Sequence, residues 1–171
     1  MYGKLAILLI ILLVAGCSQT SNETKMENKR VSANYPIQKN GDYEIPQSAI
    51  HWHPKLKIII KGQEQEIPIN VGISIGQNID NEISGMRMSP IHTHEDDGTI
   101  HMENDKPYAK PETLTLGYFF KVWNKTFNST CIFKYCNGPE GKVKMLVNGE
   151  ENDRFDSYYM RDGDQIEIRY E

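Results

Sequence analysis

The sequence predicts an α+β fold: a mixed sheet with one main helix and an inserted histidine-rich β-hairpin. Three observations support this prediction. Apolar and polar residues alternate after residue 54, a helical stripe of large apolar residues follows residue 115, and two more strand-like segments end the chain. The predicted order is hairpin, helix, strand and strand.

Two sets of apolar residues alternate with polar ones on either side of Gly62: Leu56, Ile58 and Ile60, then Ile67, Ile69 and Val71. A period of two indicates strands with one buried face, and a glycine between two such runs indicates a hairpin. We therefore expect the first hairpin here.

One helix is predicted by apolar residues at helical spacing: Leu116, Phe119, Phe120, Trp123 and Phe127. Thr115 stands where it can cap the first turn. The strands at 143–147 and 165–170 follow, with a tight turn at Asn148 and Gly149 after the first of them.

The first 16 residues have the composition of a secretory signal peptide: Lys4, an apolar run and small residues before Cys17. The string LVAGC at 13–17 resembles the lipobox of prokaryotic lipoproteins. That resemblance implies lipidation of Cys17 and an outward-facing, membrane-anchored protein, periplasmic or extracellular. The alternative is a plain secretory signal with an incidental cysteine.

Residues 17–45 are predicted to be a lipid anchor and disordered tether, because they hold few bulky apolar side chains, and residues 46–171 a single domain. The net charge of −4 and the lack of a basic patch with aromatic residues exclude nucleic acid as a partner. In an oxidising compartment Cys131 and Cys136 are expected to form a disulfide, with ligation of a soft metal as the alternative.

All five histidines lie in three similar strings: IHWH at 50–53, IHTH at 91–94 and IHME at 100–103. A two-residue turn at Asp97 and Gly98 would place His94 opposite His101 and His92 opposite Glu103. A four-residue turn at 95–98 would shift the pairing but leave these side chains on one face. His51 and His53 also lie two apart, so that segment is expected to lie beside the hairpin as an edge.

Imidazole is a preferred ligand of zinc and copper, and carboxylates beside it can fix the ring orientation. We therefore predict a transition-metal site, with these ligands: His51, His53, His92, His94, His101, Glu103, Met86 and Met88. The thioethers favour copper over zinc, although core packing is an equal explanation for them. The alternatives are a hydrogen-bonded polar hairpin and a metal-free catalytic or pH-sensing site.

The strings HWHPKLKIIIKG, PIHTHEDDGTIHME and LTLGYFFKVWN together resemble a family of exported prokaryotic domains whose activity is uncharacterised. That resemblance implies a shared fold and a shared histidine site, and no activity. The tail, VNGE followed by RDGDQIEIRY, resembles the end of β-grasp, ubiquitin-like domains, and implies a β-grasp core. It lacks the terminal Gly-Gly of sulfur carriers, so carrier chemistry of that kind is not expected.

Three functions follow as hypotheses. The first is a binding protein that captures, buffers or delivers copper or zinc to an exported metalloenzyme or transporter. The second is an enzyme with three histidines on the metal and one open position; the HExxH and GxSxG signatures are absent. The third is a metal-free protein-interaction module. The first is the prediction we retain, and the sequence leaves open whether the protein is an enzyme.

Overall fold

The computed structural model describes residues 37–40, 43–77, 87–104 and 109–171, which belong to one unit by their contacts. The predicted signal peptide, Cys17 and most of the predicted tether lie outside the described residues. Strands β1 (Ile37–Asn40) and β2 (Tyr43–Pro46) pair antiparallel, and Ile45 is buried in the core. Ile45 thus contributes to the core, next to residue 46, where the sequence predicts the domain to begin.

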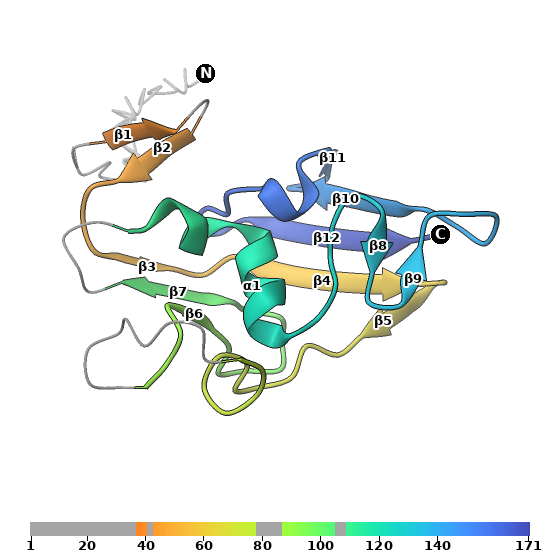
Figure 1. The fold of residues 1–171 in the computed structure, drawn as a ribbon, viewed down its shortest axis with the longest axis horizontal. Coiled ribbons are helices and arrows are strands. Elements are labelled where there is room, and N and C mark those ends of the chain that lie inside the picture. The colour runs from red at the N-terminus through yellow and green to blue at the C-terminus, as the bar shows by residue number, and fades with distance from the viewer. Residues whose placement is uncertain (1–36, 41–42, 78–86, 105–108) are drawn as a thin grey trace, which may run out of the picture. The chain divides into compact units, whose positions relative to one another are not determined.

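The larger sheet has five strands in the order β11 (Glu150–Glu151), β10 (Val143–Val147), β12 (Gln165–Tyr170), β4 (Lys55–Ile60) and β5 (Gln63–Gln65). Figure 1 shows β12 between β10 and β4. The β12 and β4 strands run parallel and the other neighbours antiparallel, so the sheet is mixed. The described chain is therefore α+β, as predicted.

One face of this sheet is apolar because the alternating residues of its two central strands are in register. Three parallel pairs supply it: Leu56 with Ile166, Ile58 with Ile168 and Ile60 with Tyr170. The turn after β10 uses Asn148 and Gly149, whose φ angles are 54° and 86°. Two positive φ values suit the tight hairpin turn that matches strand twist.

The predicted helix is confirmed over α1 (Leu116–Trp123), which follows a short 3-10 helix, η1 (Pro111–Leu114). Phe127, the last residue of the predicted stripe, lies beyond the end of the helix. The Thr115 hydroxyl accepts a hydrogen bond from the Tyr118 N–H at 3.2 Å, which satisfies one free donor of the first turn. The helix ends at Asn124, which has a left-handed φ of 59°. Its apolar stripe shares one core with the larger sheet.

The prediction for the second strand of the first hairpin is wrong in part. Strand β5 has only three residues, and Ile69 is 45% exposed although Ile67 and Val71 are buried. Pro68 has no N–H to give to a sheet. The Thr93 side chain holds this segment instead, because its hydroxyl donates to the Pro68 carbonyl at 2.7 Å and accepts from the Val71 N–H at 3.0 Å.

A second sheet has three strands, with β7 (His101–Asn104) between β3 (Ile50–Trp52) and β6 (Ile91–His92). Ile50, Ile91 and Met102 belong to the core that the larger sheet and α1 share. Because successive side chains of a strand point to opposite faces, the histidines of β3 and β7 lie on the face away from that core.

Two short strands, β8 (Cys131–Ile132) and β9 (Tyr135–Cys136), form a separate hairpin. Cys131 and Cys136 face each other across it and are joined as a disulfide. A second 3-10 helix, η2 (Phe155–Ser157), lies between β11 and β12. Within the described ranges, no helix is both long enough and apolar enough to cross a membrane.

Candidate metal centre

The histidines are collected by the three-stranded sheet, and β7 is its middle strand. His101 and Glu103 lie two apart on β7 and therefore share a face. His92 of β6 lies opposite His101, and His51 of β3 lies opposite Glu103. All three histidine strings, at 50–53, 91–94 and 100–103, thus contribute to one patch of side chains.

The pairing predicted from a two-residue turn is wrong, and the register is the one that the four-residue alternative predicts, with His92, His101 and Glu103 on one face. His92 pairs with His101 and not with Glu103, and His94 lies in the loop beyond β6. The loop between the two strands covers residues 93–100 and is longer than a two-residue turn. Within it the Asp97 side chain accepts the Thr99 N–H at 2.9 Å and closes a local turn. This is the shift that a four-residue turn produces.

The first group of possible ligands is His92, His94 and His101, whose nitrogen atoms lie within 4.8 Å of one another. His92 is fully buried, and its Nδ1 lies 3.0 Å from the Ser89 carbonyl oxygen. A carbonyl only accepts, so Nδ1 carries the proton and Nε2 keeps its lone pair. That Nε2 lies 3.1 Å from Nε2 of His94.

This spacing suits a shared metal ion. Two nitrogens bound to one ion at about 2.0–2.1 Å stand roughly 3–3.4 Å apart in square or tetrahedral geometry. A backbone carbonyl behind a ligating imidazole is also the usual outer partner that fixes its tautomer. His92 and His94 therefore have the spacing of two ligands of one ion, and His92 also has the outer partner that fixes its tautomer.

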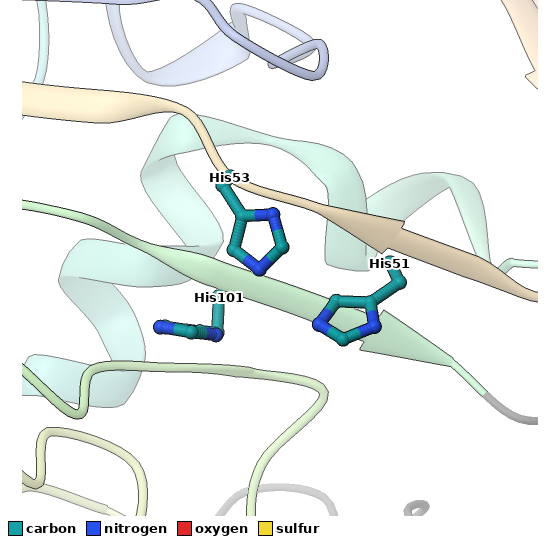
Figure 2. A group of neighbouring side chains, drawn as sticks. All are labelled: His51, His53 and His101. Carbon is teal, nitrogen blue, oxygen red and sulfur yellow. The ribbon is translucent and has the colours of Figure 1, made fainter.

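The second group is His51, His53 and His101, again with nitrogens within 4.8 Å of one another. Figure 2 shows the three rings close together, with His51 and His53 on one chain segment and His101 on the neighbouring strand. The ring centroids of His53 and His101 lie 4.8 Å apart and those of His51 and His53 4.7 Å apart. The backbone N–H of His53 donates to Asp162 Oδ1 at 2.9 Å, which anchors this segment beyond the end of β3.

Two carboxylates border the histidines. Glu95 Oε2 lies 3.0 Å from Nε2 of His101, and Glu103 Oε1 lies 3.1 Å from Nε2 of His51. Asp97 of the same loop instead binds Lys55 Nζ at 2.7 Å.

Burial keeps part of the cluster neutral. Loss of solvation lowers the pKa of His92, and it also lowers the pKa of His53, with the nearby His101 and His51 as further causes. The hydrogen bond from His101 lowers the pKa of Glu95. Neutral imidazoles beside ionised carboxylates are the protonation states in which these groups bind metal cations.

His101 Nδ1 provides an independent test of fit. It is buried and has no hydrogen-bond partner among the described residues. A buried polar atom without a partner is destabilising, and such atoms are uncommon in folded proteins. A metal ion beside it would supply the missing interaction.

The other predicted ligands are not brought into the cluster by any described contact. Met86 lies outside the described residues, and Met88 is buried at 9% exposure. The ligand role of Met88 stays a prediction. The Ser89 carbonyl and Asp162 were missed by the sequence reasoning, because no residue pattern marks a backbone acceptor or a partner more than a hundred positions away.

Comparison with models of protein families, with curated proteins and with solved structures found no match to this chain. The function is therefore argued from the site.

Proposed function

We propose that this protein is a transition-metal binding protein that holds copper or zinc through His92, His94 and His101. The observation that supports this most is the grouping of three imidazole nitrogens within 4.8 Å, with His92 oriented by the Ser89 carbonyl. Imidazole nitrogen is a borderline ligand that suits zinc and copper and not magnesium or calcium.

The role we propose is capture, buffering or delivery of the ion. Support comes from the number of protein donors, since the five imidazoles are joined by two carboxylates, Glu103 beside His51 and Glu95 beside His101. So many side-chain donors can complete the coordination of an ion without a substrate or water. Saturation by protein ligands is expected of a carrier, whereas a catalytic ion keeps an open position.

The compartment belongs to the same proposal. The lipobox-like string that ends at Cys17 supports an exported lipoprotein, anchored at the outer face of a membrane and delivering its ion to an exported metalloenzyme or transporter. The order hairpin, helix and strand pair, with a parallel contact between β4 and β12, supports a β-grasp-like domain with an inserted histidine hairpin.

The test is metal titration of the full-length chain, purified in detergent, with Cu(II) and Zn(II) in separate experiments. We expect tight binding, with Kd below about 1 µM, and loss of the inner site in the double variant His92→Ala/His94→Ala. Cu(II) is the stronger test, because nitrogen sites bind it more tightly than other divalent first-row ions.

The matched control is Asp97→Asn, which changes a carboxylate of the same loop that binds Lys55 and not a histidine. The control should bind metal as the parent does. Absence of binding to the parent chain, or a double variant that binds metal as tightly as the parent, would contradict the proposal and leave the interaction module.

A further inference from the structure

His101 is the one residue that both histidine groups contain. It lies on the middle strand of its sheet, opposite His92 on one side, while His53 stacks edge-on against it from the other. The His101 ring can therefore contribute a ligand atom to either group.

The two ring nitrogens of His101 have different neighbours. Nε2 contacts Glu95 at 3.0 Å, in the loop that also holds His94. Nδ1 lies 3.8 Å from Glu103 Oε1, the same oxygen that contacts His51 at 3.1 Å. Figure 2 shows one ring nitrogen of His101 turned toward His51 and His53, and the other pointing away from them.

Each side of the ring also has a pair of further imidazoles. His92 and His94 stand together on one side, with their Nε2 atoms 3.1 Å apart. His51 and His53 stand together on the other, and Glu103 adds a carboxylate oxygen. Each pair thus forms a group of possible ligands with His101.

We infer that His101 bridges two metal ions. Nε2 and the pair His92 and His94 form an inner site, and Nδ1 with His51, His53 and Glu103 forms an outer site. This rests on the proposed metal-binding function and adds a second ion to it. The ring gives up its remaining N–H proton to solvent when the second ion binds, so each nitrogen then has one lone pair for one ion.

The dimensions of an imidazole agree with such a bridge. Metal–nitrogen bonds of about 2.0 Å on both nitrogens would set the ions roughly 6 Å apart. The bridge would satisfy His101 Nδ1, a buried atom that has no hydrogen-bond partner in the described part of the chain. The bridge would also couple the metal affinities of the two sites, because an ion bound to one nitrogen fixes the orientation of the ring for an ion on the other nitrogen.

The two sites differ in their access to solvent. The His51 side chain is 64% exposed, whereas His92 is fully buried. The ligands suit divalent copper or zinc at both sites. The outer site is therefore the exchangeable one, and the inner site is the one that retains its ion.

The test compares copper content with spin intensity in the full-length chain loaded with Cu(II). Bound copper is measured by elemental analysis and unpaired spin by electron paramagnetic resonance. An imidazolate bridge couples two Cu(II) spins antiferromagnetically, so the parent should bind two ions and show less signal than its copper content requires. The variant His51→Ala/His53→Ala should bind one ion and show the full signal.

Circular dichroism of each variant checks the fold, and the single variant His51→Ala, at an exposed position, replaces the pair if the pair fails to fold. Two ions in the parent with full signal would overturn the bridge. A single ion in the parent, held by His92 and His94, would overturn the outer site but leave the proposed function standing. No bound copper in the parent would contradict both the bridge and the proposed metal-binding function.

Discussion

Gly72→Ala is expected to destabilise the protein and to disturb the inner metal site, because Gly72 packs directly behind His92. The φ of Gly72 is +74°, and a Cβ there would lie 2.5 Å from the Ile91 carbonyl oxygen and 3.2 Å from the His92 Cβ. The Gly72 carbonyl accepts the Ser89 N–H at 2.8 Å, and the Ser89 carbonyl in turn orients His92.

The magnitude has two parts. A left-handed conformation costs an alanine about 1–2 kcal/mol. Displacing packed backbone adds about 1–3 kcal/mol, for a total of roughly 2–5 kcal/mol. This is a large share of the roughly 5–15 kcal/mol that separates folded from unfolded domains. Movement of His92 should also weaken Cu(II) binding by about tenfold or more, the usual effect of disturbing an outer partner of a ligand.

The matched control is Gly62→Ala, because Gly62 has a similar φ of +80° and nothing within 4 Å of its Cβ position. Urea unfolding of the metal-free proteins measures both, and the control should lose only the conformational part, about 1–2 kcal/mol. Equal losses in the two variants, together with unchanged copper affinity, would refute the close approach of Gly72 to His92.

Three further changes test other contacts. Tyr158→Phe should lower the free energy of unfolding by about 1.5–3 kcal/mol, because the phenol donates to the buried Asp164 carboxylate at 2.7 Å. Burial, and then that hydrogen bond, raise the pKa of Tyr158 above its ordinary 10.0, so its stabilising effect is complete below pH 10 and is lost as the pH rises above it. Alkaline stability curves of the parent and the Phe variant should therefore converge, and curves that stay parallel would contradict this. Asp97→Asn breaks a solvent-exposed ion pair with Lys55, so it should lower the free energy of unfolding in urea by at most about 1 kcal/mol and leave copper binding unchanged. Weaker copper binding by this variant would show that the geometry of the loop depends on the ion pair. Thr115→Ala removes the helix cap and should cost about 0.5–2 kcal/mol, whereas an unchanged unfolding midpoint would mean that the cap is dispensable.

Much of the local structure followed from short-range patterns. The cap at Thr115, the apolar stripe of α1 and the turn at Asn148 depend on residues within a few positions of one another. The first hairpin shows where this reasoning fails. Ile69 continues the alternation in the sequence, yet it is exposed, because Pro68 ends the pairing and Thr93, a distant residue, holds the segment.

The histidine cluster divides in the same way. By itself the sequence determined that His101 and Glu103 share a face, since the period of a strand is two whatever its register. Only the tertiary structure decided that His92 lies opposite His101, that β3 brings His51 to Glu103, and that the Ser89 carbonyl orients His92. The register of β6 on β7 depends on the conformation of the loop between them, and the place of β3 depends on core packing between segments some fifty residues apart. No local pattern decides either of these.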